Sequence, residues 1–202
     1  MIRSDMSNCL VHLTRAATEA AAAEAFLSIV SSRELRGSSR DIRGGYKCVC
    51  FSEAPLAVLV HSLALPAVHG LRYAPFGVIV AKDWLFTQGG RPVVYQPEEE
   101  FDLLSEDIRY RHVRYDPTKG PDYTWEREWR IRTSALSLHL AKVTFIVPTR
   151  SWEEHFFEEH AGQQRSQAFF VGRNATFGIE RSAMHFIALE DLGIHFSSVP
   201  ER

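Results

Sequence analysis

The chain contains 202 residues and carries a formal net charge of −2 at pH 7, so no whole-chain basic field favours nucleic acid, although local basic patches stay possible. Hydrophobic residues make up 45% and charged residues 24%, which is typical of an ordinary globular protein, and we expect one domain over 1–202. The three cysteines, Cys9, Cys48 and Cys50, suit neither a disulfide framework nor a zinc site. We expect a cytoplasmic protein with no signal peptide, no membrane partner and no metal.

The first half of the chain predicts strands, helices and a long polar loop. Thr18 is a plausible N-cap for an alanine-rich helix, and Ser52 is expected to cap a second helix that has Pro55 near its first turn. In chain order the expected elements are a strand at 9–14, a helix at 16–32, a glycine-rich basic loop at 33–45, a strand at 46–51 and a helix running to about 64.

The second half predicts mostly short strands. The expected elements are a strand at 76–80, a helical turn at 82–85, a turn at Gly89–Gly90, a strand at 92–96, a helical segment at 97–107, strands at 107–115, 123–133 and 142–147, a helix at 151–164, and strand-like pieces at 169–172, 184–189 and 194–199. This mixture indicates an α+β fold with mainly antiparallel strands.

Two polar side chains share one face of the first expected strand. His12 and Thr14 are two residues apart, and side chains alternate along a strand, so both can point into a cleft while Val11 and Leu13 pack inward. Taken alone, a histidine at a strand end that is satisfied by its neighbours is the simpler interpretation.

A second group follows the buried strand at 46–51. Phe51 and Ser52 end the strand, and the helix that follows carries His61. A helix N-terminus offers unpaired N–H groups and a partial positive charge. A purely structural interpretation takes Phe51 as a core residue and Ser52 as a simple helix cap. It accounts for the two residue types, but not for their position after a His-x-Thr strand.

The third group is the alternating segment 123–133. It places Glu126 and Glu128 on one strand face, about 6–7 Å apart, with Arg130 on the same face to offset their like charges. A solvated edge strand is the simpler interpretation. Trp125 and Trp129 argue against it, because they anchor the strand in a core.

These three groups, in this order, resemble the ADP-ribosyltransferase superfamily in its diphtheria-toxin and poly(ADP-ribose) polymerase branch. His12-x-Thr14 resembles the opening motif, Cys50-Phe51-Ser52 the aromatic–small–acidic segment, and Glu126-x-Glu128 the catalytic glutamate motif. His61 falls where that branch has a tyrosine that stacks on nicotinamide.

The chain is similar, more closely still, to bacterial DNA-targeting ADP-ribosyltransferase toxins and to abortive-infection phage-resistance proteins. The similarity to the latter lies in 77–95 and in Glu128-Trp129-Arg130, while Arg40 or Arg43 matches by position a functional arginine of the toxins. The resemblance implies a single ADP-ribosyltransferase-like domain with a mainly antiparallel split sheet and flanking helices. Residues 133–202 show no such resemblance.

The resemblance also implies a role for each candidate residue. NAD is the expected substrate, Glu128 the catalytic carboxylate beside the ribosyl cation, and Glu126 the group that deprotonates or orients the acceptor. The expected NAD-binding residues are His12 and Thr14 at the riboses, Phe51 and His61 at the nicotinamide ring, Ser52 at the carboxylate or ribose, Arg43 or Arg91 at the pyrophosphate, and Tyr95 from the similar segment.

Three functional interpretations stay open. The first is transfer of ADP-ribose to a nucleic acid or protein acceptor by a toxin or phage-defence effector, with an antitoxin or immunity protein as a possible partner. The second is an NAD-depleting glycohydrolase. The third, from another class, is a non-catalytic module of the same fold that binds a nucleotide or a partner; a structural protein with a charged interface strand is a further alternative.

Overall fold

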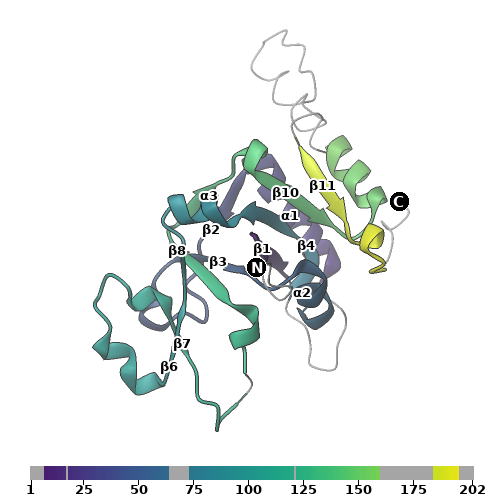
Figure 1. Ribbon diagram of the computed structural model, residues 1–202. Helices are drawn as coiled ribbons and strands as arrows, with labels where there is room; N and C mark the ends of the chain where they lie inside the picture. Colours follow the sequence, from purple (N-terminus) through teal and green to yellow (C-terminus); the bar gives the residue numbers. More distant parts are fainter. Residues whose placement is uncertain (1–6, 17, 64–72, 121, 160–183, 196–202) are drawn as a thin grey trace, which may run out of the picture. The chain divides into compact units, whose positions relative to one another are not determined.

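The computed structural model describes residues 7–16, 18–63, 73–120, 122–159 and 184–195. Its largest sheet has seven strands (Figure 1). They are β1 (Cys9–Arg15), β3 (Cys48–Ser52), β4 (Tyr73–Ala81), β5 (Arg91–Pro92), β8 (Glu128–Arg132), β10 (Val143–Val147) and β11 (His185–Ala188).

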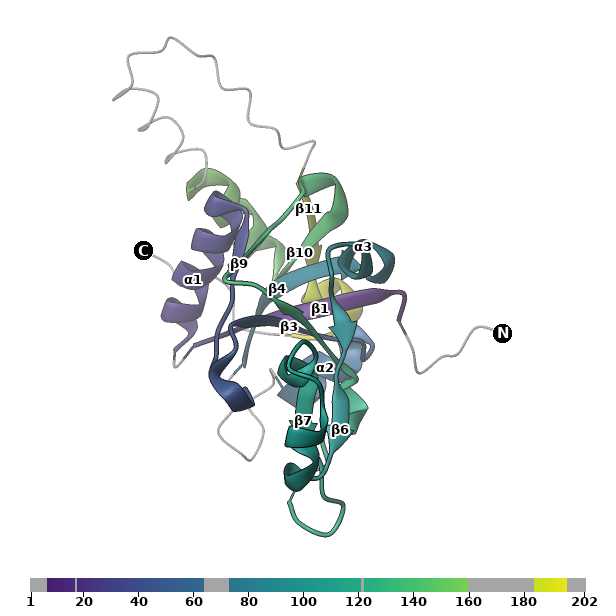
Figure 2. The ribbon, with the colours of Figure 1, turned by 90° about the vertical axis from the view of Figure 1, so that its left-hand side faces the viewer.

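The strand order in this sheet is β11-β10-β4-β1-β3-β8-β5. The pairs β1–β3, β3–β8 and β5–β8 are antiparallel, whereas β10 and β11 run parallel. Two small sheets join β2 (Glu34–Arg36) to β9 (Ala135–Ser137), antiparallel, and β6 (Val94–Gln96) to β7 (His112–Arg114), parallel (Figure 2). The predicted α+β class with mainly antiparallel strands is confirmed.

Helices flank the sheet. They are α1 (Glu19–Ser32), α2 (Leu56–Leu63), α3 (Lys82–Thr87) and a helix over 150–159. Short 3₁₀ helices lie at Arg43–Gly45, Glu98–Leu103, Arg109–Arg111, Thr124–Glu126, Leu140–Lys142 and Leu189–Leu192. The predicted cap of α1 is confirmed, because the Thr18 hydroxyl accepts a hydrogen bond from the Ala21 N–H at 3.2 Å.

The chain divides into two compact units. The first comprises residues 1–12, 34–59 and 79–138. Its buried residues include Val49, Leu85 and Ile131. In this unit Ile42, Cys48 and Tyr110 form one buried cluster.

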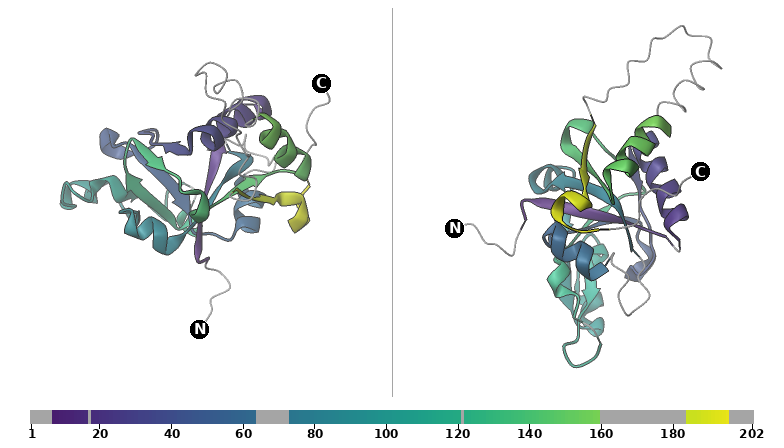
Figure 3. Two further views of the ribbon diagram at one scale, coloured as in Figure 1. Left: turned by 90° about the horizontal axis from the view of Figure 1, so that it is seen from above. Right: turned by 90° about the vertical axis from the view of Figure 1, so that its right-hand side faces the viewer.

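The second unit comprises residues 13–33, 60–78 and 139–202, and its described core is rich in aromatic rings. Phe26 of α1 lies 4.9 Å from Phe156 between ring centroids, so α1 packs beside the 150–159 helix (Figure 3). Phe76 of β4 contacts Trp152 edge to face at 5.1 Å. Edge-to-face pairs of this kind add to the stability that burial alone gives.

Two local predictions in the first half of the chain are wrong. Ser52 is the last residue of β3 and does not cap α2; the Pro55 carbonyl accepts the first helical hydrogen bond, from Leu59 N–H at 3.0 Å. The segment expected to be a loop at 33–45 contains β2, which pairs with β9 about a hundred residues away, a partner that local composition does not reveal. The piece expected at 169–172 lies outside the described residues, as does most of the piece expected at 194–199, whose described residues Ile194 and His195 form no strand.

Candidate functional site

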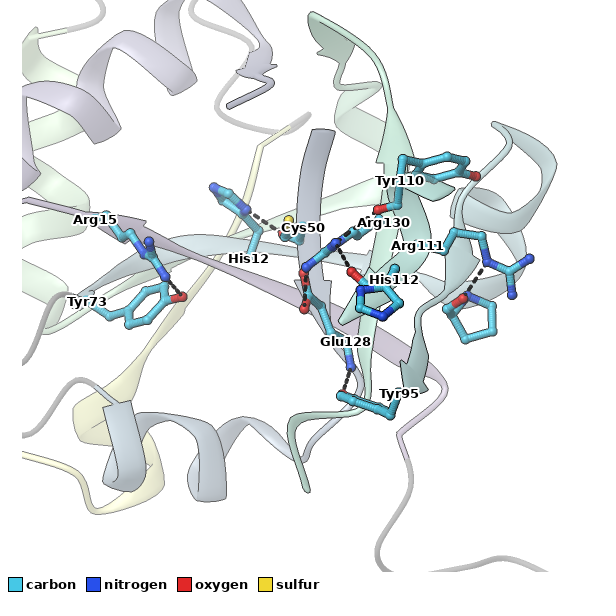
Figure 4. A network of polar contacts seen from close by, with 11 residues as sticks. His12, Arg15, Cys50, Tyr73, Tyr95, Tyr110, Arg111, His112, Glu128 and Arg130 are labelled. Atoms are coloured by element: carbon cyan, nitrogen blue, oxygen red, sulfur yellow. Dashed lines mark hydrogen bonds and ion pairs between the residues drawn. The ribbon is translucent and has the colours of Figure 1, made fainter. Parts of the chain in front are cut away.

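Glu128 opens β8 and lies at the centre of a polar network in the first unit (Figure 4). Its two carboxylate oxygens accept hydrogen bonds from Arg130, from Nε at 2.7 Å and from Nη2 at 3.1 Å. The Glu128 side chain is 19% exposed and the Arg130 side chain 5%. The predicted compensation of Glu128 by Arg130 is confirmed, in a two-point geometry that fixes the carboxylate.

Arg130 is held in turn by backbone carbonyls. Its Nη1 donates to the carbonyl oxygens of Tyr110 and His112, both at 2.9 Å. Burial lowers the pKa of Arg130, but the charge and hydrogen bonds of Glu128 outweigh burial, so the net shift of that pKa is upward. The guanidinium is therefore a permanent cation with four hydrogen bonds in fixed directions.

Tyr95 approaches Glu128 from β6. The Glu128 backbone N–H donates to the Tyr95 hydroxyl oxygen at 3.1 Å. Burial, with the nearby Glu128 charge, raises the pKa of Tyr95 to about 12 even though the backbone hydrogen bond acts the other way. The phenol therefore stays neutral at physiological pH and keeps a proton that it can donate.

Cys50 lies opposite Arg130 on the neighbouring strand β3. Burial raises the pKa of its thiol strongly, and the Glu128 charge raises it further. Burial likewise raises the pKa of Cys48. Because the thiolate is the reactive form, neither thiol is suited to act as a nucleophile.

His12 lies on β1, the strand on the other side of β3. Its Nδ1 lies 2.8 Å from the carbonyl oxygen of Cys50, and its ring centroid lies 5.7 Å from that of Phe51. A carbonyl oxygen can only accept, so Nδ1 carries the proton. The strand order thus places His12 and Glu128 on the two strands that flank β3.

The prediction that Glu126 and Glu128 share one strand face is wrong. Residues Thr124–Glu126 form a 3₁₀ turn, and Arg127 adopts a left-handed conformation with φ of 46°, so the strand begins only at Glu128. The Glu126 carbonyl accepts hydrogen bonds from the Ser52 hydroxyl at 2.6 Å and from the Glu53 N–H at 3.1 Å. These contacts with the end of β3 hold the turn and break the alternation.

Ser52 and Phe51 are both enclosed. Ser52 is 6% exposed; its hydroxyl donates to Glu126 and accepts from the Ala54 N–H at 3.1 Å. Phe51 is 2% exposed and packs against His12. Ser52 therefore orients the turn next to Glu128, and Phe51 limits the positions that the His12 ring can adopt.

Thr14 and His61 belong to the second unit. Thr14 is 5% exposed, and its hydroxyl oxygen makes no hydrogen bond within the described part of the chain. His61 is an exposed residue in the last turn of α2. Their assignment to NAD stays a prediction from the sequence.

The two arginines expected at a pyrophosphate have partners within the protein. Arg43 pairs with the Glu98 carboxylate at 2.6 Å and lies over the Phe101 ring at 4.1 Å. Arg91 donates to the carbonyl oxygens of Phe86 and Gly90 at 2.8 and 2.7 Å, at the end of α3. A pyrophosphate would have to compete with these contacts.

Sequence reasoning missed Glu53. This carboxylate is 6% exposed and accepts hydrogen bonds from Lys82 Nζ at 2.5 Å and from Trp129 Nε1 at 2.9 Å. The available signal was a carboxylate placed directly after a buried strand and before Ala54-Pro55, where no solvent-exposed face is expected. Its partners come from α3 and β8, which the sequence does not place next to it.

Comparison of the chain with protein-family models, curated proteins and solved structures gave no match. Of the described residues, none lies in a helix long and apolar enough to cross a membrane.

Proposed function

We propose that this chain transfers ADP-ribose from NAD to a macromolecular acceptor, as a toxin or phage-defence effector, with Glu128 as the catalytic carboxylate. The bond between the nicotinamide nitrogen and C1 of the ribose breaks, and nicotinamide leaves with the bonding electrons. The acceptor nucleophile then bonds to C1 and releases one proton. The Glu128 carboxylate stabilises the positive charge that develops on the ribose between these events.

The observation that supports this proposal most is the fixed, partly open carboxylate of Glu128. Its buried partner Arg130 and the backbone contact to Tyr95 define its position, while 19% of its side chain stays exposed. A charge that stabilises a transition state works best when its orientation is set in advance on a rigid strand. The neighbouring strand β3 carries Phe51 and Ser52, and the next strand, β1, carries His12.

Glu126 retains a modified role in this proposal. It does not share the face of β8, but it ends the 3₁₀ turn that leads into the strand and is partly exposed. A carboxylate on this turn can deprotonate or orient the acceptor, whereas transfer to water would make the protein an NAD glycohydrolase.

One observation favours a second candidate, a non-catalytic module that binds a nucleotide or a partner. Both oxygens of Glu128 are already engaged by Arg130, so the network also suits a purely structural role. The two candidates differ in a simple respect: only the enzyme releases nicotinamide.

The test is whether the purified protein releases nicotinamide from NAD. The reaction is run with and without added DNA, RNA or cell lysate, and chromatography measures the released nicotinamide. We expect Glu128→Gln to lower the rate about 100-fold or more, because removing one preorganised electrostatic group has an effect of this size. Glu106→Gln, at an exposed carboxylate, is the matched control and is expected to keep the wild-type rate.

Each result separates the candidates. Release that depends on Glu128 and rises with one acceptor supports a transferase, and release without any acceptor supports a glycohydrolase. An unchanged rate in Glu128→Gln would contradict the assignment of the carboxylate. If no nicotinamide is released but NAD still raises the melting temperature, the result supports the non-catalytic binding module. Growth arrest on expression that Glu128→Gln relieves is the result expected of a toxin.

A further inference from the structure

His112 is a buried histidine at the start of β7 that takes no direct part in the proposed reaction. It belongs to the first unit and is 3% exposed, so its ring cannot contact a substrate. Its Nε2 lies 3.1 Å from the carbonyl oxygen of Pro97, and because a carbonyl oxygen can only accept, Nε2 carries the proton. The ring also meets Phe101 edge to face, with 5.3 Å between the centroids. These two contacts fix the His112 ring, and with it the backbone at this point of β7.

The carbonyl group of His112 is one of the two that hold Arg130 (Figure 4). Arg130 Nη1 donates to the carbonyl oxygens of Tyr110 and His112, both at 2.9 Å, which uses both protons of that nitrogen. The other edge of the guanidinium, formed by Nε and Nη2, donates to Glu128. A guanidinium is planar and rigid, so a shift of the carbonyls at one edge moves the other edge as well. The position of β7 therefore decides where Arg130 holds the Glu128 carboxylate.

Strand β6, the partner of β7, holds the backbone of Glu128. His112 lies opposite Val94 in the parallel β6–β7 register. Val93, directly before β6, donates its N–H to the Glu128 carbonyl at 2.9 Å, and the Tyr95 hydroxyl accepts from the Glu128 N–H at 3.1 Å. The small sheet thus fixes Glu128 twice, by its backbone through β6 and by its side chain through β7 and the guanidinium.

The His112 ring closes the loop that joins these two strands. Pro97 directly follows β6, so the hydrogen bond from Nε2 ties the end of β6 to the start of β7 across residues 98–111. Within this loop Phe101 contacts the His112 ring on one side chain and the Arg43 guanidinium, 4.1 Å from its centroid, on another. Loss of the His112 donor would remove the tie to Pro97 and loosen the base of the loop.

We infer that His112 is a positioning residue: it fixes the β7 carbonyl that orients Arg130, and through Arg130 it orients Glu128. The inference depends on the proposed function, because this position affects a rate only if Glu128 stabilises the ribosyl cation. Misplacing a group by about 1 Å can lower a rate by about 100-fold. Since His112 acts through Arg130, we expect a smaller loss of about tenfold in kcat, with the KM for NAD almost unchanged.

Three substitutions at this position separate the hydrogen bond from the packing. His112→Phe keeps a ring against Phe101 and removes the donor to Pro97. His112→Gln restores an N–H donor at a similar reach, and we expect its kcat to stay within about threefold of wild type. His112→Asn carries the same amide on a side chain shorter by one methylene, and we expect it to behave like His112→Phe. If His112→Phe does not fold, the comparison of His112→Gln with His112→Asn decides the question.

A spectroscopic measurement reports the position of Arg130 without catalysis. The Arg130 side chain is 5% exposed and its Nε–H donates to Glu128 at 2.7 Å, so this proton is expected to exchange slowly with water. NMR spectra of isotope-labelled protein, with the signal assigned by Arg130→Lys, measure the exchange rate. We expect about tenfold faster exchange in His112→Phe and in His112→Asn, and the wild-type rate in His112→Gln.

Val80→Ala is the matched control for a general loss of stability. Val80 is a buried aliphatic residue of β4 in the same unit, so its truncation lowers stability without removing a polar contact. We expect this variant to keep both the kcat of wild type and the slow exchange of the Arg130 Nε–H.

The outcomes separate this inference from the proposed function. An equal fall of kcat in Val80→Ala, or unchanged exchange of the Arg130 proton in His112→Phe and in His112→Asn, would overturn the inference. Wild type that releases no nicotinamide would refute the proposed function and with it the effect on rate. The exchange rates would then still decide whether His112 holds the ion pair of Arg130 and Glu128.

Discussion

The two faces of β8 hold two carboxylates in opposite ways. On one face Glu128 is 19% exposed, and its partner Arg130 is 5% exposed; on the other Glu53 is 7% exposed, and its partner Lys82 is 24% exposed. In the first pair the cation is buried and the anion is partly open, and in the second pair the burial is reversed. Glu128 can therefore present a fixed negative charge to a ligand, whereas Glu53 serves to join β3, α3 and Trp129.

The largest loss of stability is expected when the buried cation of the first pair is removed. We expect Arg130→Met to lower the free energy of unfolding by about 3–5 kcal/mol, because one partner of a buried ion pair is lost and the carbonyls of Tyr110 and His112 lose their donor. Urea denaturation followed by circular dichroism measures the change.

The matching double variant isolates the pair. Glu128→Leu/Arg130→Met leaves no unpaired charge, so we expect it to be more stable than Arg130→Met alone. If the double variant is the less stable of the two, the ion pair is not what makes Arg130 important.

A smaller loss is expected on the opposite face. Glu53→Gln keeps the size of the side chain but turns one acceptor oxygen into a donor amide, which then faces either Lys82 Nζ or Trp129 Nε1. We expect a loss of about 1–3 kcal/mol, the usual cost of leaving a buried polar group unsatisfied. Tryptophan fluorescence during urea denaturation reports it.

Lys82→Gln provides the control for that face. The lysine is partly exposed, so its loss is expected to cost less than Glu53→Gln. A larger loss in Glu53→Gln than in Arg130→Met would reverse the assignment of the two faces.

The parts of the fold that depend on local pattern could be predicted from the sequence. The capped helix after Thr18 and the alignment of Arg130 with Glu128 follow from side-chain periodicity. The position of Glu126 could not be predicted, because the left-handed Arg127 and the hydrogen bond from Ser52 depend on β3, and Ser52 lies 74 residues before Glu126. The partners of Glu53 depend on the packing of distant elements in the same way.

The smallest loss of stability is expected at Tyr95, which contacts the backbone of Glu128. We expect Tyr95→Phe to cost about 1 kcal/mol at neutral pH, since the Glu128 N–H loses its acceptor. The pKa of Tyr95 is about 12 in the folded protein, above its value of about 10 in an unfolded chain, so the folded state binds the proton more tightly. The contribution of Tyr95 to the free energy of unfolding is therefore complete below pH 10 and is lost as the pH rises towards 12.

Urea denaturation at pH 9 and pH 11.5 should show wild type losing more stability than Tyr95→Phe between the two pH values. The difference in tyrosinate absorbance between the two proteins should have its midpoint near pH 12. Parallel losses in the two proteins would show that Tyr95 is solvated and that the Glu128 face is more open than the ion pair suggests.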